Sequence, residues 1–196
     1  YNAVVPEKAY GPVTVPKTDK ILTRLHEIAT EKGFSPSSLT NYIRNPSQFY
    51  MQRILRINEA DEVEENIAVN TLGTIIHNAL EELYTPYLNQ YLALHHIETM
   101  ETKIDEVILK HFKEIYKEGE ITKGKNLLAF EVAKRNVYNF LQLEKKDIEE
   151  GQAIKVVLLE ASLSCEIEVK SLPFPIKIAG KVDRIEERNG AIRIID

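Results

Sequence analysis

Residues 180–196 of this 196-residue chain read GKVDRIEERNGAIRIID and contain its clearest structural signal. Asn189-Gly190 stands between two runs rich in isoleucine and valine, and this dipeptide is the strongest short signal for a two-residue β-hairpin turn. In the register that such a turn sets, Asp183 faces Asp196 across the two strands. The sequence therefore predicts a hairpin that carries two carboxylates as cross-strand neighbours on one face.

The opposed aspartates would repel each other. Directly opposed side chains have Cβ atoms roughly 4.5–5.5 Å apart. At about 5 Å and an effective dielectric constant of about 20, the repulsion is on the order of 3 kcal/mol. A divalent cation between Asp183 and Asp196 would remove it, since carboxylate oxygens suit Mg²⁺, Mn²⁺ or Ca²⁺. The spacing alone is equally compatible with two exposed strand ends or with a bulge that shifts the register. On the other face, Glu186 and Arg193 are expected to form a cross-strand ion pair.

Helical patterns precede the strands. Ser35-Pro36 and Asn45-Pro46 each combine a capping side chain with a proline suited to a first helical turn, so two short helices are expected there. Other helices are expected at residues 19–33, within 65–88, near 101–117 and near 125–149, and strands from residue 155 onward. This order predicts the α/β class, of the mixed α+β type, with the acid-bearing hairpin after a helical N-terminal part.

The organisation expected along the chain has three parts. Residues 1–18, with three prolines, are expected to be a linker from a preceding region. Residues 19–151 form the helical part, and residues 152–196 form the sheet part. Because the chain begins at Tyr1 and stops inside an apolar run, we expect it to be a piece of a longer protein.

Composition excludes several classes of protein. The hydrophobic content of 43% allows one folded domain with a core, and the net charge of −5 is unlike that of a strongly basic nucleic-acid binder. Cys165 is the single cysteine, which excludes an internal disulfide and an all-cysteine metal site. No apolar run approaches the roughly 20 residues of a membrane span. A cytoplasmic protein without a membrane partner is expected.

One predicted helix carries a glycine and a histidine on the same face. In LGTIIHNALEEL, residues 72–83, Gly73, His77 and Glu81 recur at four-residue spacing. Glycine inside a helix costs roughly 1 kcal/mol relative to alanine, so Gly73 is expected to make room beside the His77 ring. A lone histidine on a helix is more often structural than a ligand, and the spacing does not decide between these roles.

A short segment free of acids, residues 41–58, carries Arg44, Arg53 and Arg56. These arginines could contact nucleic-acid phosphates, or they could decorate a helix surface, and the sequence supports both equally. The interleaved aromatic residues are expected in the core instead: Tyr42, Phe49 and Tyr50.

Three stretches in order resemble the nuclease domain of RecB and AddB proteins, in the PD-(D/E)XK nuclease superfamily. They are FSPSSLTNYIRNPSQFYMQRILRI (34–57), LGTIIHNALEEL (72–83) and GKVDRIEERNGAIRIID (180–196). The resemblance covers residues 34–196 and implies a restriction-endonuclease-like core. It implies a Mg²⁺- or Mn²⁺-dependent deoxyribonuclease, an exonuclease by preference. It also implies DNA as substrate and a helicase domain or subunit as partner.

The resemblance also assigns residues. Asp183 and Asp196 match the two metal-binding acids, and His77 matches the helix histidine that completes the metal site. Glu160 is similar to the acidic residue of the family's first strand. These four are the expected catalytic residues, and the first three are the expected metal ligands.

Two departures from the family pattern matter. The family's lysine belongs two positions after Asp196, and a later helix with Gln and Tyr follows it, so the 196-residue chain is expected to be inactive or poorly active alone. Asn45 stands where many relatives have an iron–sulfur cysteine, so no such cluster is expected. One alternative is a catalytically degenerate module with a structural or protein-binding role. Another is a helical adaptor with an incidental hairpin, which predicts no divalent metal binding.

Overall fold

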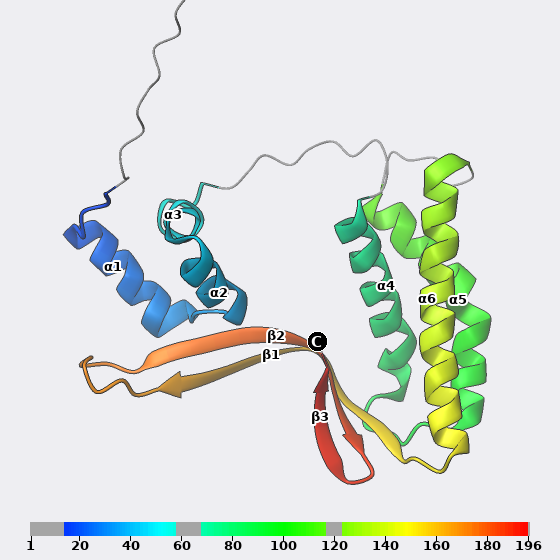
Figure 1. The fold of residues 1–196 in the computed structure, drawn as a ribbon. Coiled ribbons are helices and arrows are strands. Elements are labelled where there is room, and N and C mark those ends of the chain that lie inside the picture. The colour runs from blue at the N-terminus through cyan, green and yellow to red at the C-terminus, as the bar shows by residue number, and fades with distance from the viewer. Residues whose placement is uncertain (1–13, 58–67, 117–122, 196) are drawn as a thin grey trace, which may run out of the picture. The chain divides into compact units, whose positions relative to one another are not determined.

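The computed structural model describes residues 14–57, 68–116 and 123–195 (Figure 1). Within these ranges, α-helices precede a sheet with the strand order β1-β2-β3. This order confirms the predicted mixed α+β class. The helices are α1 (Asp19–Glu27), α2 (Pro36–Arg44), α3 (Pro46–Phe49), α4 (Val69–Tyr84), α5 (Leu94–Ile115) and α6 (Gly124–Glu149). The strands are β1 (Ile154–Ile167), β2 (Ile176–Arg188) and β3 (Ala191–Ile195).

The chain divides into two compact units. Unit 1 comprises residues 1–58 and 164–179, and unit 2 comprises residues 59–163 and 180–196. The sequence-based division into a linker, a helical part and a sheet part stays a prediction. Residues 1–13 of that linker lie outside the described ranges.

In unit 1, the two proline-led helices form where their caps predict them. The Ser35 hydroxyl oxygen accepts the backbone N–H of Ser38 at 3.1 Å at the start of α2. The Asn45 side-chain oxygen accepts the backbone N–H of Gln48, also at 3.1 Å, at the start of α3. Each cap satisfies an amide that lacks a partner in the first turn, which confirms both predicted helix starts.

Gly33 lets the end of the first helical stretch meet the sheet. It follows the π-helical segment Ile28–Lys32 and has φ +87°, a conformation that favours glycine. A Cβ atom there would lie 2.7 Å from the Cβ of Ala179 on β2. The next residue, Phe34, donates its N–H to the carbonyl of Lys177 and accepts the N–H of Ala179. Glycine is therefore required for the close approach of this segment to β2.

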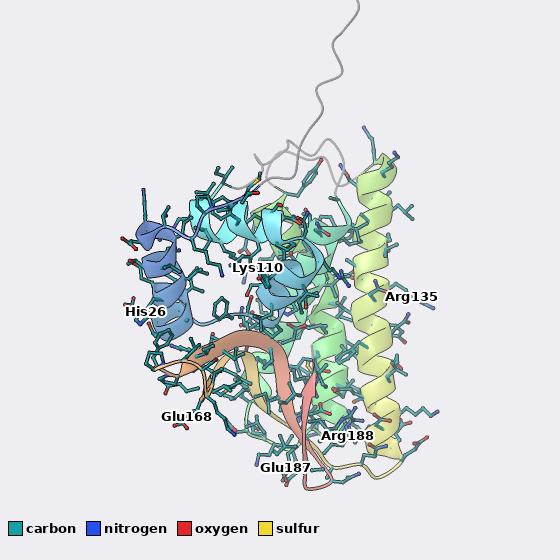
Figure 2. The ribbon with its side chains drawn as sticks, turned by 60° about the vertical axis from the view of Figure 1, so that its left-hand side comes forward. His26, Lys110, Arg135, Glu168, Glu187 and Arg188 are labelled. Atoms are coloured by element: carbon teal, nitrogen blue, oxygen red, sulfur yellow. The ribbon has the colours of Figure 1, made fainter. Side chains whose placement is uncertain are left out.

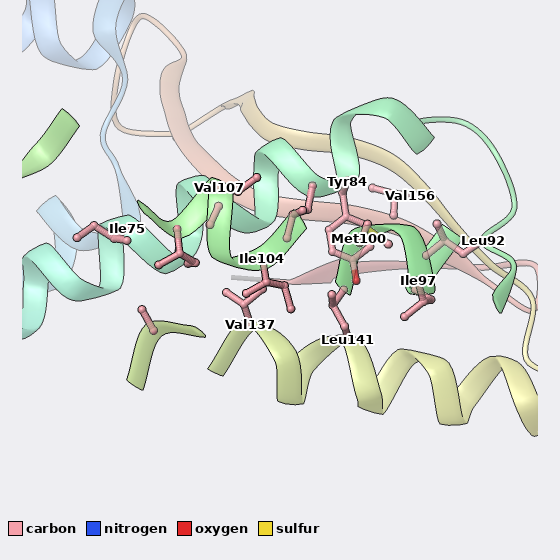
Figure 3. Close-up of a cluster of buried hydrophobic side chains, with 14 of the residues drawn as sticks. Ile75, Tyr84, Leu92, Ile97, Met100, Ile104, Val107, Val137, Leu141 and Val156 are labelled. Atoms are coloured by element: carbon pink, nitrogen blue, oxygen red, sulfur yellow. The ribbon is translucent and has the colours of Figure 1, made fainter. Parts of the chain in front are cut away.

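Unit 2 is built around α4, α5 and α6, which lie side by side (Figure 1). Their facing side chains form one apolar cluster (Figure 3). Leu92, which precedes α5, and Val156 of β1 also belong to it. Helix α5 begins at Leu94, earlier than the sequence analysis expected. His96 explains the early start, because its Nδ1 atom accepts the backbone N–H of Ala93 at 3.2 Å. Among the described residues, no helix combines the length and the apolar character needed to cross a bilayer.

The predicted hairpin is confirmed in turn and register. Asn189 and Gly190 have φ values of 52° and 82°, as the first and second positions of a type I′ turn require. The strands β2 and β3 are antiparallel, and their pairs are Arg184 with Ile195, Ile185 with Ile194, Glu186 with Arg193, Glu187 with Ile192 and Arg188 with Ala191. The expected Glu186–Arg193 ion pair is confirmed, with 3.6 Å between Oε1 and Nη1. Asp196, and with it the predicted pairing with Asp183, lies outside the described residues.

Candidate metal centre

Three side chains from three separate elements of unit 2 converge on one point. His77 comes from α4, Glu160 from β1 and Asp183 from β2. The Nε2 atom of His77 lies 2.7 Å from Oε1 of Glu160 and 2.6 Å from Oδ1 of Asp183. The three ligand atoms all lie within 4.8 Å of one another. The sequence segments that hold them are far apart, so the tertiary fold creates this cluster.

The donor set of this cluster fits a divalent cation. A single N–H on His77 Nε2 cannot donate a linear hydrogen bond to Glu160 and Asp183 at once. Two carboxylate oxygens and one imidazole nitrogen can instead all face a shared cation, and carboxylate oxygens are the ligands that Mg²⁺ and Mn²⁺ favour. His77, Glu160 and Asp183 therefore form a possible metal-binding group.

The backbone at Glu160 is strained. Its φ is 51°, in the left-handed region, although it lies within β1 and carries a side chain. A non-glycine residue in this region costs on the order of 1–2 kcal/mol, and such residues gather at functional sites. The Glu160 side chain is only 11% exposed. The fold thus accepts a local cost to hold this carboxylate against His77.

Lys181 is a further charged group beside the cluster. Its ammonium pairs with the Oε2 atom of Glu160, and its side chain is 60% exposed. It precedes Asp183 by two residues on β2, so both side chains point to the same face of the sheet. The hydrogen bond to Glu160 raises the pKa of Lys181. Lys181 therefore stays charged and partly neutralises the carboxylates.

The cluster opens into a small cavity of about 110 Å³. Besides His77, Glu160 and Asp183, its lining includes Leu80, Tyr84, Phe140 and Leu159. The apolar side chains wall one side of the cluster, whereas the Asp183 side chain is 44% exposed, so solvent reaches the other side.

A buried ionic network lies directly behind Asp183. The next residue, Arg184, places its Nη2 atom 2.6 Å from Glu144 of α6 and 2.6 Å from Glu186. Its guanidinium also stacks over the ring of Tyr84, 4.7 Å from the centroid, and the Tyr84 hydroxyl donates to Glu144. Burial, together with the Glu144 carboxylate, raises the pKa of Tyr84 well above its usual value, and burial raises the pKa of Glu144. This network fixes β2 against α4 and α6 next to the cluster.

A second arginine extends the network toward the hairpin turn. Arg188 donates from Nε to Glu186 at 2.9 Å and pairs with Asp147 of α6. Its neighbour Glu187 points to the other face, where it accepts from Tyr91 at 3.1 Å and pairs with Lys155 at 3.2 Å. Figure 2 shows both side chains near this end of the hairpin. The carboxylates and cations of the network thus tie the sheet to the helices at several points.

Gly73 does not have the role that the sequence analysis gave it. A Cβ atom at Gly73 would meet no heavy atom within 4 Å among the described residues. The His77 ring therefore does not depend on a missing side chain one turn earlier. Close packing within this part of the chain gives no reason for glycine there.

Two of the three arginines predicted to contact nucleic acid lie around the same cavity. Arg53 and Arg56 line one cavity of unit 1, whereas Arg44, exposed on α2, is not among its lining residues. The expectation for the aromatic residues holds for Phe49, which is 6% exposed, and is wrong for Tyr42, which is 54% exposed. Tyr42 packs its ring edge-to-face against Phe49, with centroids 5.3 Å apart, at the surface.

Sequence reasoning missed Lys181 and the buried partners of Arg184. A lysine two residues before a candidate ligand on one strand was a usable signal for Lys181, because such residues share a face. No comparable local signal existed for Tyr84 or Glu144. They belong to helical patterns in which only the apolar positions predicted burial.

Comparison with known proteins identifies the superfamily of this chain. A model of the PD-(D/E)XK nuclease superfamily matches residues 33–196. The chain belongs to this superfamily. The match covers His77, Glu160 and Asp183, and nucleases of this superfamily generally use divalent metals.

Individual relatives carry no further functional description. The chain is 23% identical over 193 residues to an uncharacterized protein of Rickettsia conorii, covering 94% of this chain and 21% of that protein. It is 24% identical over 185 residues to an uncharacterized protein of Rickettsia typhi, covering 87% of this chain and 19% of that protein. The chain thus spans about a fifth of the length of the curated relatives it matches.

Proposed function

We propose that this chain is part of a metal-dependent DNA nuclease domain of the RecB/AddB type, which hydrolyses phosphodiester bonds. The convergence of His77, Glu160 and Asp183 on one point, in a chain of the PD-(D/E)XK superfamily, carries the proposal. The resemblance of residues 34–57, 72–83 and 180–196 to RecB and AddB segments supports the finer assignment.

Each residue of the cluster has a proposed role. Glu160 and Asp183 supply the carboxylate oxygens that hold a divalent cation, Mg²⁺ or Mn²⁺. His77 adds a neutral imidazole nitrogen, Nε2, as a third ligand beside the two carboxylates. A cation bound at such a site lowers the pKa of a coordinated water and polarises the scissile phosphate. Asp196 is included as a further ligand on the strength of the resemblance.

Other groups of this chain prepare the site. The Arg184–Glu144–Tyr84 network holds β2 in place, so that Asp183 keeps a fixed position relative to His77. Leu80 and Phe140 pack beside the cluster and limit the space around its inner side. The family's lysine, expected two positions after Asp196, would orient the attacking water in a polypeptide that continues the chain.

We further propose a place for the domain in DNA processing. The resemblance supports an exonuclease that acts on linear DNA beside a helicase domain or subunit. The length of the relatives is compatible with additional domains in the same polypeptide.

The test is cleavage of end-labelled linear DNA with Mn²⁺ or Mg²⁺. It should be run on a polypeptide that continues this chain through the expected lysine, and on the 196-residue chain in parallel. We expect metal-dependent cleavage by the longer protein, abolished by Asp183→Asn or Glu160→Gln, and little or none by the shorter one. A correctly folded longer protein that binds metal but never cleaves DNA would point to the catalytically degenerate alternative. Cleavage that survives both substitutions would reject the proposed site.

A further inference from the structure

Unit 1 contains a cavity with a strongly basic lining. It has a volume of about 690 Å³ and lies between the first helical stretch and the segment Phe49–Arg56. Four cationic side chains line it: Arg24, Lys32, Arg53 and Arg56. Among the described residues that line it, none is acidic. This basic cavity contrasts with the net charge of −5 of the whole chain.

Three of these cations form no ion pair with a carboxylate among the described residues. Arg24 pairs with Glu27 at 2.8 Å, and Glu27 lines a neighbouring cavity instead. Lys32, Arg53 and Arg56 form no ion pair within the described ranges, and all three side chains are exposed. Glu27 is close enough to interact electrostatically with Lys32 and Arg56 as well as with Arg24, but one carboxylate does not balance four cations. The excess positive charge around the concavity attracts anions.

Arg24 adds a buried donor to this cavity. Its side chain is 16% exposed, and its Nε atom is buried with no hydrogen-bond partner among the described residues. A buried donor without a partner costs free energy, which a bound acceptor would recover. Ser35 and Gln52 supply neutral polar groups in the same lining, and α2 begins there. A phosphate oxygen is an acceptor that suits guanidinium, hydroxyl and helix N-terminal groups together.

We infer that the basic cavity binds the phosphate backbone of a single-stranded nucleic acid. This inference rests on the proposed function for the choice of nucleic acid as the ligand. Cations from two segments, the first helical stretch and Phe49–Arg56, can engage several phosphates at once, which a polyanion offers and a single phosphate ion does not. Single strands are bound in positively charged grooves that follow their flexible backbone, and a concave site admits such a strand more readily than a stiff duplex.

The test measures how a fluorescein-labelled single-stranded oligodeoxynucleotide binds to the 196-residue chain. Fluorescence anisotropy reports the binding, and the buffer contains EDTA. EDTA prevents cleavage, so binding is measured apart from the nuclease chemistry. Lys32→Ala and Arg53→Ala each remove one exposed cation of the cavity. We expect each to weaken binding about three- to tenfold and to reduce the slope of log K against log salt by about one or less. Melting curves confirm that both variants fold.

Arg44→Ala is the matched control, because Arg44 is also an exposed arginine of unit 1 but does not line the cavity. We expect it to change binding less than about twofold, since it loses only long-range attraction. Equal losses in all three variants, or no loss in the cavity variants, would overturn the assignment. So would failure of the wild-type chain to bind the oligonucleotide.

Competitors identify the source of the phosphate. Unlabelled single strand should displace the probe at a much lower total phosphate concentration than inorganic phosphate, a mononucleotide or duplex DNA. Displacement by inorganic phosphate or mononucleotide at the same phosphate concentration would overturn the strand assignment, and equal displacement by duplex would overturn the preference for single strands. Cavity-dependent binding in a protein that never cleaves DNA would count against the nuclease proposal alone.

Discussion

The Nε2 atom of His77 lies 2.6 Å from the Oδ1 atom of Asp183, which joins the middle of α4 to the middle of β2. Glu160 approaches the same nitrogen from β1 at 2.7 Å. One imidazole nitrogen therefore meets two carboxylates, and a shared cation resolves this arrangement better than a shared proton.

Lys181 should compete with a metal for Glu160. Its ammonium pairs with that carboxylate, so a cation that binds at the cluster must share or displace a positive charge. We expect Lys181→Gln to tighten Mn²⁺ binding about two- to tenfold, because a neighbouring like charge disfavours the cation. Isothermal titration calorimetry measures the affinity directly.

Lys155→Gln is the control for Lys181, because Lys155 pairs with Glu187 and not with the cluster. Its Mn²⁺ affinity should equal that of the wild-type chain. Weaker Mn²⁺ binding in Lys181→Gln would show instead that the lysine supports the metal site.

Glu144 should matter for stability more than an exposed ion-pair partner does. Its side chain is 4% exposed and pairs with the buried Arg184 at 2.6 Å. Glu144→Ala leaves a buried guanidinium short of one counter-charge and is expected to lower the free energy of unfolding by about 3 kcal/mol. Urea denaturation measures the loss. Glu98→Ala, which removes an exposed partner of Lys145, should cost less than about 1 kcal/mol. Similar losses for the two variants would contradict a structural role for the network.

Two glycines should respond to alanine in opposite directions. Gly33 has φ +87°, and a Cβ there would lie 2.7 Å from the Cβ of Ala179, so Gly33→Ala should destabilise the chain by about 2 kcal/mol. Gly73 lies inside α4 with open space around its missing Cβ. Gly73→Ala should therefore stabilise the chain by up to about 1 kcal/mol through helix propensity. Thermal melting measures the stability of both variants. If Gly73→Ala lowered the melting temperature, the open space around Gly73 would be contradicted.

The pH dependence of stability should include a term from Glu82. The hydrogen bond from Lys110, at 2.9 Å, lowers the pKa of Glu82 below its ordinary value of 4.5, and the nearby His111 ring contributes as well. A carboxyl whose pKa is lowered on folding stabilises the protein above its unfolded pKa, and this contribution is lost as the pH falls through the folded pKa. Because the side chain is 37% exposed, we expect less than about 1 kcal/mol.

Urea denaturation between about pH 6 and about pH 3 tests the Glu82 contribution. Wild type should be more stable than Glu82→Gln at the upper end, and the two should converge at the lower end. Glu168→Gln is the control, because Glu168 is an exposed carboxylate in residues 164–179 of unit 1. Its free energy of unfolding should have the same pH dependence as that of the wild type. A difference between wild type and Glu82→Gln that does not change with pH would contradict the expected linkage.

Local sequence signals predicted the elements that local physics determines. Asn189-Gly190 set the hairpin register, and Ser35 and Asn45 set two helix starts, because a turn type or a cap depends on a few adjacent residues. The meeting of His77 with Asp183 was predicted from the family resemblance, since helical spacing left the role of His77 open.

The rest depends on contacts between distant segments. The left-handed backbone of Glu160 and the burial of Glu144 against Arg184 arise only when β1, β2 and α6 come together. The basic cavity likewise combines residues of the first helical stretch with Arg53 and Arg56. Periodicity within one segment contains no information about such partners.

Calorimetric titration of Mn²⁺ into the wild-type chain and into Asp183→Asn tests whether His77, Glu160 and Asp183 form a metal centre. Glu187→Gln is the control, because Glu187 is a β2 carboxylate paired with Lys155 outside the cluster. We predict one Mn²⁺ site in the wild type and in Glu187→Gln, with an affinity at least about tenfold lower in Asp183→Asn. Asp183→Asn should nevertheless unfold at a temperature close to that of the metal-free wild type. Unchanged Mn²⁺ affinity in Asp183→Asn, or no Mn²⁺ binding by a folded wild-type chain, would contradict the metal centre.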